Sequence, residues 1–83
     1  MLDDSLIRMA AREAGAKIAG RSINDEEKLV SSGLIDSLSV LRLIALLEKK
    51  LSISIPPETL QPEDFDDVET IVETVQRVAK PLH

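Results

Sequence analysis

The sequence predicts an all-α fold: a small four-helix bundle of three main helices and one short helix, with a long loop between helices 1 and 2. The chain has 83 residues, 43% of them hydrophobic, and one aromatic residue, Phe65. A core of Leu, Ile and Val is typical of small helical bundles. Three stretches carry apolar residues at three- and four-residue intervals, the spacing of a helix. A chain of this length supports one small core, so we expect a single domain, residues 1–83.

The first helix is expected over residues 3–20. Its apolar residues follow helical spacing: Leu6, Ile7, Ala10, Ala14 and Ile18. Asp3 and Asp4 suit the positive end of the helix dipole, and Gly20 suits the end of the helix. Residues 21–36 then form a connection longer than the 2–8 residues common in helical bundles, and long loops often carry function.

The second helix is expected from Ser37 to Leu51, with Asp36 as its N-cap. Its apolar stripe follows helical spacing: Leu38, Leu41, Leu43, Ile44, Leu47 and Leu51. The stretch 52–57, SISIPP, alternates and then reaches two prolines. We expect an extended connector here, because the sequence offers no partner strand.

Residues 57–65 fit one short helical turn broken by Pro62. The last helix is expected from Asp66 or Asp67 to Ala79, with acidic residues at its start and basic residues at its end, in the order that the helix dipole favours. The apolar face of this helix comprises Val68, Ile71, Val72, Val75 and Val78. The expected core is lined by Leu41, Leu43, Ile44, Leu47, Ile55, Leu60, Phe65, Val68, Ile71 and Val75.

The charge balance limits the classes of partner. The net charge of −5 argues against a general nucleic-acid binder and against anionic membrane surfaces, and it favours partners with basic patches. The chain has no cysteine, which excludes disulfides, thiolate catalysis and thiolate metal sites in the polypeptide. No apolar run approaches the roughly 20 residues of a membrane span, and the first ten residues lack a signal pattern, so we expect a soluble cytoplasmic protein.

Ser37 lies in the stretch GLIDSL (33–38), at the entrance of the second helix. The single histidine, His83, is the last residue, and a chain terminus rarely holds a general base in place, which disfavours a serine hydrolase. The acidic run at 63–69 lacks the spacing of a calcium-binding loop, and we expect no metal site. The simplest interpretation of Ser37 is a first-turn serine whose hydroxyl competes for backbone donors.

Three features favour a function for Ser37. Asp36 already serves as the cap, so the serine is not needed for that role. Leu34, Ile35 and Leu38 supply more apolar surface than a cap requires. The free N–H groups and positive dipole at a helix N-terminus also favour anions, so a serine there is suited to bear a phosphodiester.

The stretch GLIDSL followed by a leucine-rich helix resembles the attachment motif of acyl and peptidyl carrier proteins, in which a D-S-L or D-S-M core carries 4′-phosphopantetheine on its serine. About residues 25–79 match in pattern. The stretches that carry the likeness are DEEKLVSSGLIDSL (25–38), IALLEKKLSISIPP (44–57) and DFDDVETIVETV (64–75). The resemblance implies a right-handed bundle and a covalent 4′-phosphopantetheine arm, transferred from coenzyme A to Ser37. Asp36 would cap the helix and help to present the serine.

The resemblance further implies a non-catalytic carrier, with an acyl or aminoacyl cargo held as a thioester on the arm. Such carriers serve fatty acid, polyketide and nonribosomal peptide biosynthesis. The implied partners are a phosphopantetheinyl transferase, a loading ligase and a downstream transferase or synthase. We expect a monomer that neither binds nucleic acid nor inserts into a membrane. The alternative is an unmodified helical interaction module that buries Leu34, Ile35 and Leu38 in a partner.

The expected docking face comprises Leu34, Ile35, Leu38, Arg42 and Ala45. In carriers of fatty-acid synthesis the exposed face of the second helix is acidic, whereas Ser39 and Arg42 stand here and only Glu48 keeps that pattern. The stretch 57–65, PETLQPEDF, looks more like that of D-alanyl, aminoacyl and other specialised carriers. We therefore expect a carrier of a dedicated pathway, and we expect Arg42→Glu to improve loading by fatty-acid-type enzymes.

Overall fold

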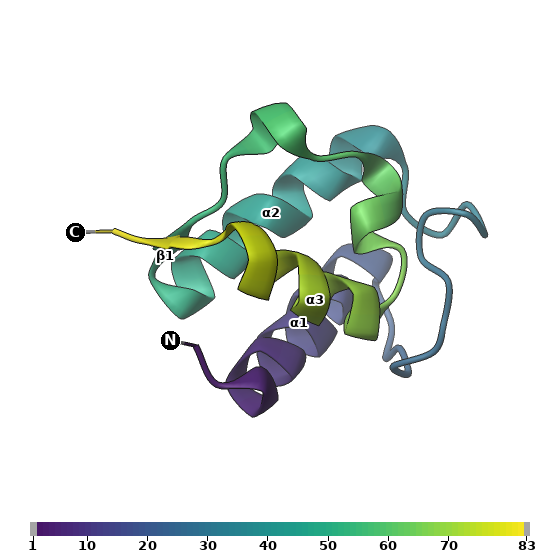
Figure 1. The fold of residues 1–83 in the computed structure, drawn as a ribbon. Coiled ribbons are helices and arrows are strands. Elements are labelled where there is room, and N and C mark those ends of the chain that lie inside the picture. Colours follow the sequence, from purple (N-terminus) through teal and green to yellow (C-terminus); the bar gives the residue numbers. More distant parts are fainter. Residues whose placement is uncertain (1, 83) are drawn as a thin grey trace.

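A computed structural model of the chain describes residues 2–82. Three α-helices pack around one core, and both ends of the chain lie on the same side of the bundle (Figure 1). The first helix, α1, packs against both of the others. In chain order the elements are α1 (Asp4–Ala19), α2 (Ser37–Leu51), β1 (Ile53–Ser54), the 3-10 turns η1 (Pro57–Thr59) and η2 (Pro62–Phe65), α3 (Val68–Val78) and β2 (Lys80–Pro81).

Helix α1 confirms the predicted first helix, one residue shorter at each end. The Asp3 carboxylate accepts a hydrogen bond from the Ser5 N–H, and Gly20 closes the helix in the left-handed conformation, at φ 79°. The inner face consists mainly of small residues, which lets the following loop approach closely. A Cβ atom on Gly15 would lie 2.6 Å from Cδ1 of Ile23. Leu6, placed in the predicted stripe, is 56% exposed instead.

Helix α2 confirms both predicted ends. Asp36 caps it, and Ser52 ends it in the left-handed conformation at φ 55°. The residues buried along the helix are Val40, Leu43, Ile44 and Leu47. The prediction that Leu41 lines the core is wrong, because its side chain is 57% exposed. Leu41 lies three residues after Leu38, and both side chains point outward on the same face.

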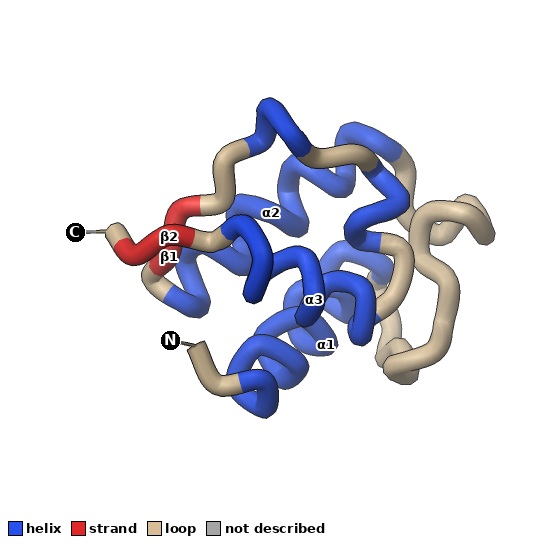
Figure 2. Tube along the Cα trace, viewed as in Figure 1, coloured by secondary structure: helices blue, strands red, loops and turns tan. Residues whose placement is uncertain are grey.

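The segment between α2 and α3 differs from the prediction in two ways. Two separate 3-10 turns replace the single short helix, because Pro57 and Pro62 each begin a new turn and neither can donate a backbone hydrogen bond. The predicted extended connector does have a partner strand. Ile53 pairs with Pro81 and Ser54 with Lys80 in a two-residue antiparallel ladder, drawn in red in Figure 2.

Helix α3 begins at Val68, after Asp67, whose carboxylate accepts a hydrogen bond from the Thr70 N–H at 2.8 Å. Its inner face packs on α1 and η2. The one buried polar side chain of this face among the described residues, Thr74, donates to the Asp64 carbonyl at 2.9 Å, which avoids an unpaired hydroxyl in the core.

The core joins all three helices to the loop and to η2. Phe65, the single aromatic residue, is fully buried, as are Leu29 of the loop and Ile7 of α1. Leu60, expected in the core, is only partly buried at its edge. No helix within residues 2–82 is long and apolar enough to cross a membrane.

Candidate functional site

Ser37 is the first residue of α2, and its side chain is exposed. The Asp36 carboxylate accepts a hydrogen bond from the Ser39 N–H at 2.8 Å, and the Asp36 carbonyl accepts one from the Val40 N–H at 3.0 Å. The hydrogen bond from Ser39 holds the pKa of Asp36 below its ordinary value. As the first residue of α2, Ser37 presents its hydroxyl at the positive end of the helix dipole, and the first turn itself contains no acidic residue.

A tight turn delivers the chain to Ser37. The Gly33 N–H donates to the Val30 carbonyl at 3.0 Å, and Gly33 adopts the left-handed conformation at φ 84°. The Ile35 N–H then donates to the Leu29 carbonyl at 2.8 Å. Ile35 is 2% exposed, so its place in the expected docking face is corrected: it anchors the turn in the core. Leu34 is partly buried.

Gly33→Ala is expected to lower the free energy of unfolding by about 1–2 kcal/mol, because an L side chain in the left-handed conformation crowds the following carbonyl. Nothing lies within 4 Å of a Cβ at this position, so the cost comes from the backbone alone. Gly33→Asn is the matched control, since asparagine tolerates this conformation better. Urea unfolding measures both, and an alanine variant as stable as the asparagine variant would contradict the account of this turn.

Asp66, at the entrance of α3, ties this loop to the bundle. Its Oδ1 atom accepts hydrogen bonds from the N–H groups of Val30 and Ser31, at 2.8 and 2.9 Å. Its backbone carbonyl accepts a third from the Leu29 N–H at 2.6 Å. Partial burial raises the pKa of Asp66, but these hydrogen bonds outweigh it, and the pKa lies below its ordinary value. The sequence predicts only that Asp66 is an acidic residue at the favourable, positive end of the last helix, and it gives no sign of these bonds to the loop.

Ion pairs add further ties between α1, the loop and α3. Arg12 makes a two-pronged contact with Asp25 at 2.9 and 3.0 Å, and Lys28 contacts Asp67 at 2.8 Å. The Arg12 hydrogen bond holds the pKa of Asp25 below its ordinary value. Partial burial raises the pKa of Asp67, but the hydrogen bonds from Lys28 and Thr70 outweigh this effect, so the pKa lies below its ordinary value. These contacts are exposed, so each contributes little alone.

Acidification is expected to loosen this loop. A carboxylate whose pKa is lower in the folded chain stabilises the fold above its unfolded pKa, and this stabilisation is lost as the pH falls through the folded pKa. For Asp25, Asp66 and Asp67 the contribution is therefore complete well above pH 3.8, the ordinary Asp value, and declines below it. Urea unfolding at pH 7, 4 and 3 measures this. A free energy of unfolding that does not fall between pH 4 and pH 3 would contradict the roles assigned to these acids.

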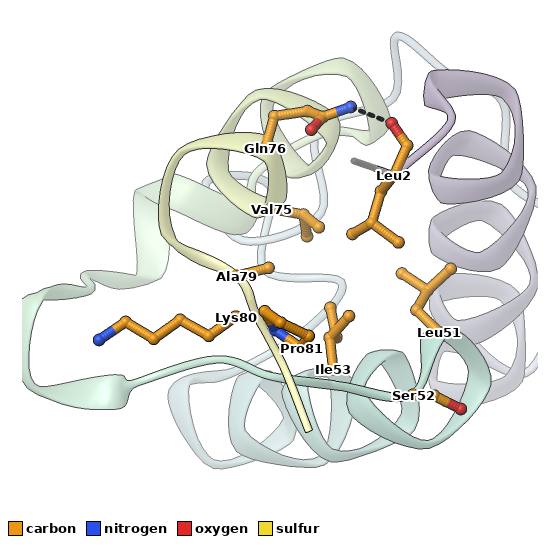
Figure 3. Close-up of a pocket in the computed structure, with 9 residues that line it drawn as sticks. All are labelled: Leu2, Leu51, Ser52, Ile53, Val75, Gln76, Ala79, Lys80 and Pro81. Atoms are coloured by element: carbon orange, nitrogen blue, oxygen red, sulfur yellow. Dashed lines mark hydrogen bonds between the residues drawn. The ribbon is translucent and has the colours of Figure 1, made fainter. Parts of the chain in front are cut away.

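Two cavities differ in their relation to Ser37. The smaller one, of about 100 Å³, lies between α2 and the two 3-10 turns and is lined by Ser37, Ile44 and Phe65 among others. The larger one, of about 400 Å³, lies at the other end of α2, between Leu51, Val75 and Leu2 (Figure 3). A 15-residue helix is about 22 Å long, so the larger cavity is remote from the serine.

The outward face of α2 is apolar next to Ser37. Leu38 is 76% exposed, and Arg42 and Ala45 are exposed on the same face. The structure therefore brings these three predicted docking residues together. It adds Leu41 to the same exposed face, although the sequence predicts that this residue lines the core. Glu48 is partly buried and accepts a hydrogen bond from the Ile55 N–H at 2.8 Å, so it secures the connector. His83 lies outside the described residues.

Comparison with known proteins bears on this site. A family model described as a phosphopantetheine attachment site matches residues 4–78. The match spans the three α-helices, the loop and the GLIDSL stretch. No curated protein matches the chain.

Proposed function

Because the chain belongs to the phosphopantetheine-binding family of acyl and peptidyl carrier proteins, whose domains carry covalent 4′-phosphopantetheine, we propose that Ser37 is the attachment point. One observation carries this proposal: within the matched residues, Ser37 is an exposed hydroxyl at the first position of a 15-residue helix, directly after the capping aspartate. The residues fit a phosphodiester, because the helix N-terminus favours an anion and the first turn adds no carboxylate to that of the capping Asp36.

The residues around Ser37 act by positioning. Asp36 caps the helix and thereby fixes the position of its first turn, from which the Ser37 hydroxyl projects. The turn at Gly33 and the buried Ile35 hold the preceding loop, so a phosphopantetheinyl transferase meets a preformed surface. The arm supplies a terminal thiol that binds the cargo as a thioester. Carriers of this family are themselves non-catalytic, and tethering raises the effective concentration of the cargo at each partner enzyme.

The cargo proposed for this carrier is a small acyl or aminoacyl group, delivered within a dedicated pathway. The cavity beside Ser37 supports this: its volume of about 100 Å³ is well below the roughly 300–1,000 Å³ of typical ligand pockets, so it shelters at most a small group. The partners are then a ligase that loads this group and a transferase or synthase that removes it. These enzymes would dock on Leu38, Arg42 and Ala45, beside the serine.

The mass of the chain isolated from its native cell tests this function. We expect the polypeptide with one phosphopantetheine arm, and a fraction with a further small cargo mass. Hydroxylamine cleaves thioesters, so it should remove the cargo and leave the arm. A chain that carries no arm in its native cell, or an added mass that resists hydroxylamine, would contradict the proposed function.

An unmodified interaction module is the second candidate, favoured by the 76% and 57% exposure of Leu38 and Leu41. Replacement of the native gene by one encoding Ser37→Ala separates the two. A carrier loses its function with the hydroxyl, whereas an interaction module retains it, because the leucines are unchanged.

A further inference from the structure

The outward face of α2 carries positive charge as well as leucines. Five exposed residues share one face of the helix, because each lies three or four positions from at least one of the others. This face is here named the outer stripe: Leu38, Leu41, Arg42, Ala45 and Lys49. Arg42 and Lys49 are seven residues apart, which places them nearly in line, about 10 Å from each other along the axis. The outer stripe therefore combines two leucines near Ser37 with two cations.

The acids nearest to the outer stripe in sequence are engaged in other contacts. Asp36 caps α2 through the Ser39 N–H, and Glu48 accepts the Ile55 N–H at 2.8 Å. Both carboxylates therefore bond to the backbone, and Arg42 adds only a weaker, longer-range attraction to the Asp36 carboxylate. Lys50, which follows the stripe, contacts Glu13 of α1 at 3.4 Å and so belongs to the interface between the two helices.

The two basic residues of the outer stripe take no part in the ion pairs found among the described residues. Six of the ten Lys and Arg residues have an acidic partner: Arg8 with Glu69, Arg12 with Asp25, Arg21 with Glu27, Lys28 with Asp67, Lys50 with Glu13 and Arg77 with Asp64. Within the described part of the chain, four basic residues have no such partner: Lys17, Arg42, Lys49 and Lys80. Two of these four lie on the outer stripe. A chain of net charge −5 thus keeps unpaired positive charge on the face that adjoins Ser37.

We propose that the outer stripe docks on the enzyme that loads the cargo, at a surface of opposite character: an apolar socket for Leu38 and Leu41, rimmed by Asp or Glu side chains that face Arg42 and Lys49. The inference rests on the proposed function, because an enzyme that acts on cargo held at Ser37 must approach this end of α2. Apolar contacts at the centre and charges at the rim are the usual anatomy of a protein interface. Rim charges of opposite sign speed association and reject partners of like charge.

Charge reversal in the native cell tests the sign of the partner surface. The variant Arg42→Glu/Lys49→Glu is expressed in place of the native chain, and intact mass reports the fraction of arm-bearing protein that also carries hydroxylamine-sensitive cargo. An acidic partner surface predicts a fall of about tenfold or more, since juxtaposed like charges cost several kcal/mol. A basic partner surface predicts a rise. A rise or an unchanged fraction would overturn the proposal.

The matched control is Lys17→Glu/Lys80→Glu, which changes the net charge equally but lies outside the outer stripe. Its cargo-bearing fraction should equal that of the native chain, and an equal fall in both variants would also overturn the proposal. Thermal unfolding of both purified variants verifies that they fold. The same mass spectra report the arm itself: a native chain without the arm refutes the proposed function, whereas an arm present with unchanged cargo loading refutes only the acidic partner surface.

Discussion

Ser37→Ala is expected to abolish transfer of phosphopantetheine to the chain completely, while the free energy of unfolding changes by less than about 0.5 kcal/mol. The phosphodiester needs the serine oxygen, and alanine supplies none. The fold does not need it, because the side chain is exposed and the cap of α2 belongs to Asp36. Intact mass after incubation with coenzyme A and a promiscuous transferase measures the first effect, and urea unfolding measures the second.

Ser39→Ala provides the matched control, two residues further along the same helix. Ser39 bonds to Asp36 through its backbone N–H, which alanine retains, so this variant should gain the full mass of the arm. A mass gain in Ser37→Ala, or equal losses in both variants, would show that another residue carries the arm or that the helix start has been damaged.

Asp66→Ala is expected to have the second largest effect: a loss of about 2 kcal/mol in the free energy of unfolding and a slower loading of Ser37. The substitution removes one oxygen that accepts two backbone N–H groups, from Val30 and Ser31. Hydrogen bonds to charged groups contribute about 1.5–3 kcal/mol, and solvent near the exposed Ser31 reduces the loss there. Loading slows because the loop that precedes Ser37 is then held less firmly. Urea unfolding and the rate of mass gain measure the two effects.

Asp66→Asn separates the hydrogen bonds from the charge. The amide oxygen has two lone pairs and can accept both N–H groups, so the asparagine variant should recover most of the stability and most of the loading rate. Glu26→Ala removes an exposed acid from the same loop and should change neither quantity. An asparagine variant as impaired as the alanine variant would show that the two hydrogen bonds do not hold the loop.

Local features of the sequence were sufficient to predict the helices. The limits of α2 were predicted correctly because a strong N-cap and an apolar stripe mark them, and both signals lie within the segment itself. The β1–β2 ladder was missed because two residues give no strand pattern, and their pairing joins Ile53 to Pro81, 28 positions further along the chain. Only the packed bundle brings these segments together.

The candidate site was predicted only in part, because some of its features are local in sequence and others depend on packing. Ser37 and its cap are local features, whereas the roles of Ile35 and Leu41 depend on how α2 and its loop are rotated against the core. Spacing alone did not determine that rotation, and the two residues were assigned the wrong way round: Ile35 is buried and Leu41 is exposed. The role of Asp66 depends on hydrogen bonds from Val30 and Ser31, which precede it by 36 and 35 positions in the sequence.

The most direct test of the central claim is to locate the arm on the chain. The native protein is incubated with coenzyme A and a promiscuous phosphopantetheinyl transferase, digested, and sequenced by tandem mass spectrometry. We predict one phosphopantetheine per chain, attached to Ser37. No modification, or an arm on any other residue, would contradict the assignment of this chain as a carrier that works through Ser37.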